Sequence, residues 1–228
     1  MVLFPQLQNL SMNMARKIKK TKEQKKHILI ALEDTKSSKF YIQTLLKDKS
    51  IVPHIVFAKH IGTDPRSVLN AIEKFEKENP KIKYDKAWLV IDKDSFTKDN
   101  FKGTIETARQ KEICVAYSNE CYELWLLLHF KNVTAYKARN EIRKELNTEF
   151  QNHFGLKYDK SEKHVYGMLI DRQEEAIKRA KKLIENLLKL NGKLDPYNDN
   201  PSTKMHLLVE CLNNLYECKK NNYLECNN

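Results

Sequence analysis

Short apolar segments alternate with longer, helix-like segments over the first half of the chain. Four of the apolar segments have the uninterrupted character of strands covered on both faces, at 27–32 (HILIAL), 51–58, 87–91 (AWLVI) and 113–117 (ICVAY). Helices are expected between them, because apolar residues recur there at helical spacing, over 37–47, 65–75 and 99–110. This alternation predicts an α/β fold with right-handed crossovers and a mostly parallel sheet flanked by helices.

The last third of the chain has helical periodicity only. One helix is expected over 171–190, ending at the C-cap signal Asn191-Gly192. A second is expected over 200–215, with Ser202 or Thr203 as its N-cap. We therefore divide the chain into a basic, flexible N-terminal arm, an α/β core and a helical C-terminal region that packs on the core, at 1–26, 27–132 and 133–228.

Acidic residues end two of the predicted strands. Glu33 follows the first strand, and Asp92 and Asp94 follow the third. In open α/β sheets ligands bind beyond the carboxyl ends of the strands, and a chain still extended there would turn Asp92 and Asp94 to the same side. Carboxylate oxygens suit Mg²⁺ or Mn²⁺. The pattern favours a metal site made by these three acids, although such residues also serve simply as polar strand ends or helix caps.

Two basic residues lie close to these strand ends. Arg66 follows the turn 62–65, in which Asp64 is placed as an N-cap, and a helix N-terminus there could bind a phosphate through its backbone N–H groups. The alternative for Arg66 is a surface ion pair. Lys93 lies between two acids, so it either contacts phosphate or offsets their repulsion.

The charge of the chain favours a polyanionic partner. The formal net charge is +11, and seven of the basic residues fall within 16–26. Such a charge suits nucleic acid, and the basic segment suits an arm lying along phosphates as well as a solvated leader. No apolar run reaches the roughly 20 residues of a membrane span, and no signal-peptide cleavage pattern is present. We expect a cytoplasmic protein that does not enter a membrane.

The cysteine pattern argues against a disulfide framework or a zinc site. The chain has five cysteines, an odd number, and none of them forms a CxxC pair. We expect them to be reduced.

The segment 118–130 (SNECYELWLLLHF) has an unusual combination of polar and apolar residues. Ser118 or Asn119 is placed to cap a helix, and an acid such as Glu120 near its start is favoured by the helix dipole. Glu123 begins an otherwise apolar stretch, where a carboxylate is costly unless it is paired or metal-bound. Trp125 and His129 are expected in the core, so Glu123 is the further candidate for the site.

These motifs resemble two known groups of proteins. An acid that ends the first strand and a DxD that ends another resemble the TOPRIM fold of topoisomerases, primases and OLD-type nucleases. More closely, the chain is similar to the RloB-like family, which includes AbiL-type phage-defence proteins, over about residues 27 to 215. The resemblance is carried by ILIALED, GTDPRSVLNAIEKF, AWLVIDKDSF, VAYSNECYELWLLLHF and NPSTKMHLLVECL. SNxxxELWLLLHF is its most specific element.

The resemblance implies a TOPRIM-like core with a C-terminal helical extension that acts as a nuclease subunit in phage defence. It implies Mg²⁺ or Mn²⁺ as cofactor, DNA or RNA (including tRNA) as substrate, and control by an AAA or ABC-type ATPase encoded nearby. Glu33 would be the general acid or base, Asp92 and Asp94 the metal ligands, and Glu123 a further member of the site.

Two departures from the family pattern leave an alternative open. Asp34 stands where the family usually has Gly, and Ser38 stands where a further Glu is common. The alternative is a non-catalytic subunit that binds nucleic acid or a nucleotide and regulates the ATPase. No Walker A motif is present, so an ATPase would be a separate protein. The oligomeric form is left open.

Overall fold

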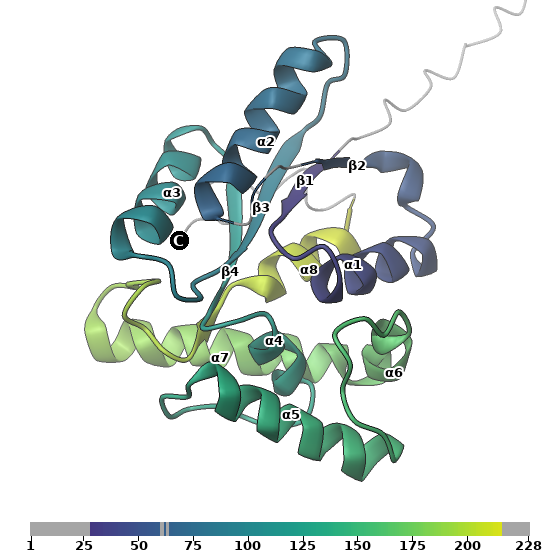
Figure 1. Cartoon of the computed structure of the whole chain (residues 1–228), viewed down its shortest axis with the longest axis vertical. Coiled ribbons are helices and arrows are strands. Elements are labelled where there is room, and N and C mark those ends of the chain that lie inside the picture. Colours follow the sequence, from purple (N-terminus) through teal and green to yellow (C-terminus); the bar gives the residue numbers. More distant parts are fainter. Residues whose placement is uncertain (1–27, 60–61, 63, 216–228) are drawn as a thin grey trace, which may run out of the picture.

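The computed structural model of the chain describes residues 28–59, 62 and 64–215. A five-stranded sheet runs through its centre in the order β2-β1-β3-β4-β5 (Figure 1). The strands are β1 (Ile28–Leu32), β2 (Ile55–Ala58), β3 (Lys86–Asp92), β4 (Cys114–Asn119) and β5 (Ser202–Thr203). The first four pair in parallel, and β5 pairs antiparallel with β4. The predicted α/β class and the mostly parallel sheet are thus confirmed.

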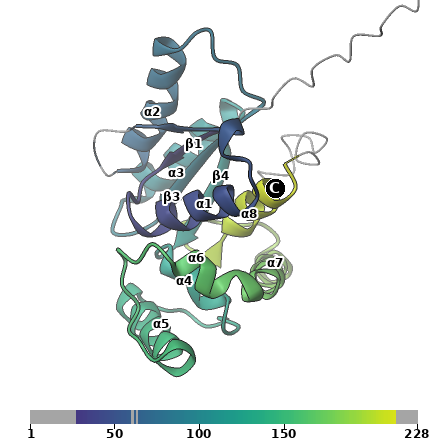
Figure 2. The ribbon, with the colours of Figure 1, turned by 90° about the vertical axis from the view of Figure 1, so that its right-hand side faces the viewer.

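Helices cover both faces of this sheet (Figures 1 and 2). They are α1 (Ser37–Asp48), α2 (Pro65–Glu78), α3 (Lys98–Gln110), α4 (Glu123–Leu128), α5 (Arg139–Phe154), α6 (Val165–Leu169), α7 (Gln173–Asn191) and α8 (Met205–Asn213), with the 3₁₀ turns η1 (Val52–His54) and η2 (Ile170–Arg172).

Alternate strand residues supply two separate cores, because successive side chains in a strand point to opposite faces. Leu29, Leu89 and Val115 lie in the core formed with α2 and α3. Ile30 and Trp88 lie in a larger core to which α1, α4, α5, α6, α7 and α8 contribute. β1 and the central residues of β3 and β4 are buried on both faces, and this explains why these segments are apolar.

Three local predictions differ from the structure. The segment 51–58 begins with η1 before β2, where Pro53 has no N–H to donate to a strand ladder. Ser118 and Asn119 are not helix caps but end β4, where Ser118 pairs with β3 and β5 and Asn119 pairs with β5. The expected helix start at Ser202 and Thr203 is the edge strand β5, although Thr203 Oγ1 still accepts a hydrogen bond from Met205 N (3.2 Å).

The C-terminal region does more than pack on the core as a helical extension, because it also forms part of the sheet. It contributes β5 as well as α5 to α8. The predicted arm, 1–26, lies outside the described residues. Cys114 and Cys121 are free and buried, whereas Cys211 is disulfide-bonded, which corrects the expectation that every cysteine is reduced.

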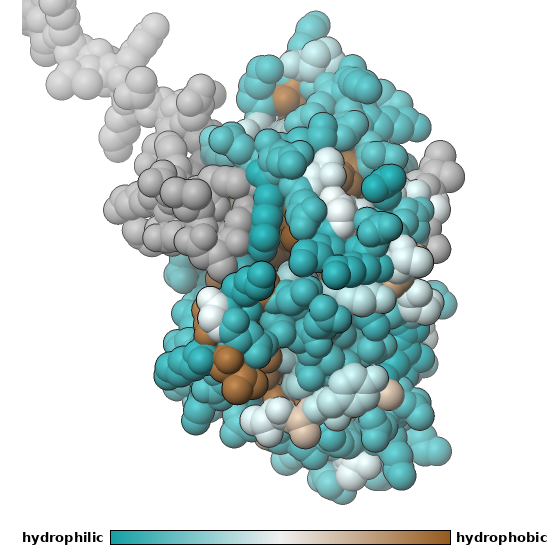
Figure 3. Space-filling model, turned by 90° about the vertical axis from the view of Figure 1, so that its left-hand side faces the viewer, coloured by the Kyte–Doolittle hydropathy of each residue, from teal (hydrophilic) through white to brown (hydrophobic). Residues whose placement is uncertain are grey.

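The face drawn in Figure 3 is predominantly hydrophilic, with a hydrophobic area in its lower part. Large hydrophobic side chains that are exposed occur at scattered positions of the described chain: Val52, Ile82, Tyr136, Leu156, Leu188 and Leu190. Within the described ranges, none of the helices combines the length and the apolar character that crossing a bilayer requires.

Candidate acidic site at the carboxyl edge of the sheet

Three carboxylates converge where β1 and β3 end and α4 begins. Glu33 directly follows β1, and its Oε2 accepts a hydrogen bond from Asp92 N at 2.9 Å. Asp92 ends β3, and its Oδ2 accepts from Tyr122 N at 3.0 Å. Glu123 is the first residue of α4, and its charge and that of Glu33 both act on Asp92. The parallel pairing of β1 with β3 therefore brings together residues 59 positions apart.

Burial and mutual repulsion disfavour the ionised forms of these acids. The pKa of Asp92 lies well above its ordinary value, first because the group is buried and then because Glu33 and Glu123 are nearby. Burial likewise raises the pKa of Glu33 to about 7, even though the Asp92 N–H and Arg139 lower it. Carboxyl groups whose pKa values are strongly raised by burial and by neighbouring acids are typical of functional sites.

Glu123 is the most deeply buried acid of the three. Its side chain is 1% exposed, and Oε1 lies 3.3 Å from Arg143 Nε and 3.9 Å from Lys160 Nζ. Its second oxygen, Oε2, has no hydrogen-bond partner. A buried oxygen without a partner is costly, so this atom is the clearest acceptor for a proton or a cation in the cluster.

Asp94 is positioned differently from the expectation. The chain leaves the extended conformation after Asp92, since Asp94 has a φ of +45° and its N–H donates to Glu120 O at 3.0 Å. Strand alternation therefore does not align Asp92 with Asp94. The Asp94 carboxylate instead pairs with Arg139. Because Arg139 also acts on the charges of Glu33 and Asp92, Asp94 borders the cluster, and its role as a metal ligand stays a prediction.

The Lys93 side chain and the backbone N–H of Arg66, the two groups considered for phosphate, each have a partner within the protein. Lys93 Nζ lies 3.0 Å from Glu120 Oε1 and 5.3 Å from the centre of the Tyr197 ring. Arg66 is the second residue of α2, and its backbone N–H donates to the Asp64 cap, as does that of Ser67. The cap confirms the predicted helix start, but it occupies the N–H groups on which phosphate binding by this turn was argued. Phosphate contact by either residue stays a prediction.

Three basic residues that surround the cluster are not apparent as site residues from the sequence. Arg139 and Arg143 lie one turn apart on α5, and Lys160 lies in the segment after it. The signal was present in Glu123, because a carboxylate in an apolar segment requires a cation. Two arginines at i and i+4 give one helix face on which such a cation can be found.

Trp125 and His129 belong to the core, as expected. Both are buried; His129 Nδ1 donates a hydrogen bond to the Trp125 carbonyl (3.0 Å), and in the neutral ring Nε2 accepts one from Tyr41 Oη (3.2 Å). Burial lowers the pKa of His129 to about 4, so the ring is neutral at physiological pH. It has no part in the acidic site.

Asp34, where the family usually has Gly, organises the start of α1. Its two carboxylate oxygens accept hydrogen bonds from Lys36 N (3.0 Å) and Ser38 N (2.9 Å). Ser38 is buried, and its hydroxyl donates to the Asp34 carbonyl (3.3 Å). The two departures from the family pattern therefore interact with each other.

This capping gives a prediction for the stability of the fold. The Asp34→Ala variant should lose about 1 kcal/mol of unfolding free energy, because two N–H groups at the helix start lose their acceptor. Asp34→Asn, which keeps one acceptor oxygen, should lose less than half as much. Urea denaturation followed by circular dichroism measures both, and equal losses would contradict a capping role.

The donor types suit a divalent cation, but their spacing does not yet form a site. Carboxylate oxygens are the ligands that Mg²⁺ and Mn²⁺ prefer, and the unpartnered Glu123 Oε2 is a buried acceptor of that kind. In the part of the chain that the structure describes, however, no three His, Cys, Asp or Glu side chains are arranged so that they could hold a metal ion. A bound metal would require Glu33, Asp92 and Glu123 to move closer together.

The fold and this cluster define an α/β protein whose parallel sheet carries buried acids at its carboxyl edge. A family model, described as RloB-like protein, matches residues 28–212. The chain belongs to the RloB-like family. No curated protein matches the chain, and no solved structure matches it either.

Proposed function

We propose that the protein is a TOPRIM-like nuclease subunit that hydrolyses nucleic-acid phosphodiesters with Mg²⁺ or Mn²⁺. The observation that carries this proposal is the convergence of Glu33, Asp92 and Glu123, with raised pKa values for the first two, at the carboxyl edge of a parallel sheet. A role in phage defence and control by an AAA or ABC-type ATPase encoded nearby belong to the same proposal and rest on the family resemblance.

Each acid has a distinct task in this proposal. Asp92 and Glu123 would hold the metal, with Asp94 as a further ligand if Arg139 releases it. Such a metal orients a phosphate, stabilises charge on the leaving oxygen and lowers the pKa of a water. Glu33, whose pKa is about 7, is suited to accept the proton of the attacking water and to return one to the leaving oxygen. Arg139 lies where it can contact a phosphate next to these acids.

The proton-transfer role of Glu33 is tested by a matched pair of neighbouring substitutions. Glu33→Gln should lower the cleavage rate by about 10²- to 10⁴-fold, because the amide cannot take a proton. Asp34→Asn removes an adjacent carboxylate that caps α1 and should stay within a few-fold of the wild type. The assay measures cleavage of labelled DNA and RNA, tRNA included, with Mg²⁺, Mn²⁺ or EDTA, each with and without the neighbouring ATPase. Equal activities of the two variants would remove Glu33 from the mechanism.

A second candidate function is binding without cleavage, which would make the chain a regulatory subunit for the ATPase. It is favoured by the cations that already compensate the acids, namely Arg139 on Asp94, and Arg143 and Lys160 on Glu123. In that case nucleic acid or a nucleotide would bind with the same affinity in EDTA and in Mg²⁺. No cleavage would occur under any condition of the assay above.

A further inference from the structure

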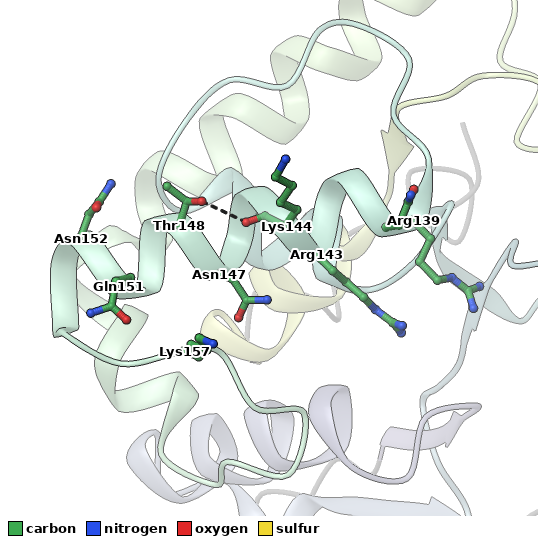
Figure 4. A pocket seen from close by; sticks show the side chains of 9 residues that line it. Arg139, Arg143, Lys144, Asn147, Thr148, Gln151, Asn152 and Lys157 are labelled. Carbon is green, nitrogen blue, oxygen red and sulfur yellow. Dashed lines mark hydrogen bonds between the residues drawn. The ribbon is translucent and has the colours of Figure 1, made fainter.

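A basic groove lies along α5, next to the acidic cluster. Its volume is about 670 Å³. The side chains that line it come from α5 and from the segment after it (Figure 4): Arg139, Asn140, Arg143, Lys144, Asn147, Thr148, Gln151, Asn152 and Lys157. Four of these residues are cationic and none is acidic, and most of the others carry amide groups. This composition suits a polyanion that also offers hydrogen-bonding groups.

The groove follows two parallel rows of side chains on one helix. Arg139, Arg143, Asn147 and Gln151 are spaced at i+4, and Asn140, Lys144, Thr148 and Asn152 form the second row. The face of α5 that borders the first row is held in the core by Ile142, Leu146 and Phe150. The rows extend over about 20 Å at the rise of an α-helix. That length accommodates roughly six phosphates of a stacked strand.

One end of the groove coincides with the acidic cluster. Arg139 pairs with Asp94, and Arg143 pairs with Glu123 across 3.3 Å. Both arginines remain partly exposed, at 30% and 43%, so their outer N–H groups can also contact a ligand in the groove. Lys144 and Lys157 are exposed, and neither forms an ion pair with another described residue. Cationic side chains therefore line the groove from its exposed part to the end next to the proposed catalytic acids.

We infer that the α5 groove binds the phosphate backbone of a single nucleic-acid strand and leads that strand to Glu33, Asp92 and Glu123. The choice of nucleic acid as the ligand rests on the proposed function. The position of the strand on the protein is inferred only from the residues that line the groove. A single strand is the occupant we choose, because the cationic and amide side chains come from one helix and the segment after it and follow one line of about 20 Å, which matches one phosphate backbone.

Binding in EDTA tests the groove separately from cleavage. Fluorescence anisotropy would follow a labelled single strand of roughly 12 nucleotides against the full chain, between about 50 and 200 mM salt. The Lys144→Ala, Lys157→Ala double variant should lower the slope of log K against log salt by about 1.4, since each lost phosphate contact on a single strand accounts for about 0.7. At about 0.1 M salt this corresponds to an affinity about 25-fold weaker.

A matched control removes two lysines at the opposite end of the molecule. Lys77 lies in the last turn of α2 and Lys83 in the following segment, and both are exposed. Their double alanine variant loses the same net charge and should bind within about twofold of the wild type. Lys144→Arg with Lys157→Arg should retain the wild-type slope.

The outcomes separate the groove from the proposed function. Equal slopes of log K against log salt for the two alanine double variants would overturn the inference that the groove binds a strand, whether or not the protein cleaves nucleic acid. A preserved difference between them would support the groove even if no cleavage is found, and then only the nuclease proposal would fail. Tighter binding of a duplex than of the single strand, with the same loss in the Lys144→Ala, Lys157→Ala variant, would overturn the choice of occupant.

Discussion

Replacing Asp92 with asparagine should abolish metal-dependent cleavage and leave the fold at least as stable as before. A carboxylate that helps to hold a catalytic metal contributes several kcal/mol to the stabilisation of the transition state. Its loss should therefore lower the cleavage rate by about 10³-fold. Asparagine has nearly the same shape, and its carbonyl oxygen can still accept the hydrogen bond from Tyr122 N.

Stability should change in the opposite direction from activity. The ionised form of Asp92 is disfavoured by burial and by the charges of Glu33 and Glu123. Asparagine carries no charge, so the variant avoids that penalty, and the gain should be about 1 to 2 kcal/mol at pH 8. Such a gain is the usual sign of a residue that is kept for function at the expense of stability.

The measurement compares urea denaturation and cleavage for Asp92→Asn and for Asp85→Asn. Asp85 is an exposed carboxylate that precedes β3 at the end of the strand opposite to Asp92. Its substitution should change neither quantity appreciably. A destabilised but active Asp92→Asn protein would show that Asp92 is a structural residue.

The strands and the acids at their ends were predictable because the signals are local. A strand that is covered on both faces is mostly apolar, so β1 and the central parts of β3 and β4 stand out in the sequence. Parallel pairing of consecutive βα units then requires their carboxyl ends to meet at one edge. The proximity of Glu33 and Asp92 follows from these two facts alone.

The features that the sequence did not reveal depend on contacts between distant segments. β5 is a strand of two residues whose pairing is provided entirely by β4, so Ser202 and Thr203 look like an ordinary helix cap. Ser118 and Asn119 likewise resemble caps of the next helix, because their partners in β5 lie far along the chain. Hydrogen bonds from Asn119 Nδ2 to the carbonyls of Pro196 and Tyr197 hold this end of β4 instead.

The orientation of the Asp94 side chain relative to Asp92 could not be predicted from the sequence either. Alternation of side chains holds only while the chain remains extended, and the positive φ of Asp94 ends that conformation. The arginine that pairs with it is 45 positions further along the chain. Conversely, Glu123 was found because a charge at the start of an apolar helix is costly wherever its partner lies.

Ionisation of Glu33 should lower the stability of the folded protein as the pH rises from about 4.5 to 8, with most of the loss below pH 7. Glu33 has a pKa of about 7 in the folded protein against the ordinary 4.5. The folded state therefore binds more protons than the unfolded state between these values, so raising the pH through this window destabilises the fold. The raised pKa of Asp92 acts in the same direction. For Glu33 the full effect is about 3 kcal/mol at most, from a shift of about 2.5 units.

Two buried histidines oppose this trend at lower pH. The pKa of His129 is lowered to about 4 and that of His206 to about 3, both chiefly by burial. Their unfolded forms bind more protons below the ordinary value of 6.5, so their contribution to stability rises with pH up to that point and is constant above it. The histidines stop contributing to the slope about one pH unit above 6.5, so below that point the contribution of Glu33 has to be separated from theirs by a variant.

Glu33→Gln isolates the contribution of Glu33. The difference in unfolding free energy between this variant and the wild type should be near zero at pH 4.5 and should grow to a maximum near pH 8, in favour of the variant. Thermal or urea denaturation across this range measures it in EDTA, and a constant difference would show that Glu33 has its ordinary pKa. Saturating Mg²⁺ should reduce the difference, because a cation that binds the ionised acids stabilises only the wild-type cluster in full. A pH slope that Mg²⁺ leaves unchanged would instead favour the binding subunit, in which Arg139, Arg143 and Lys160 are the permanent partners of these acids.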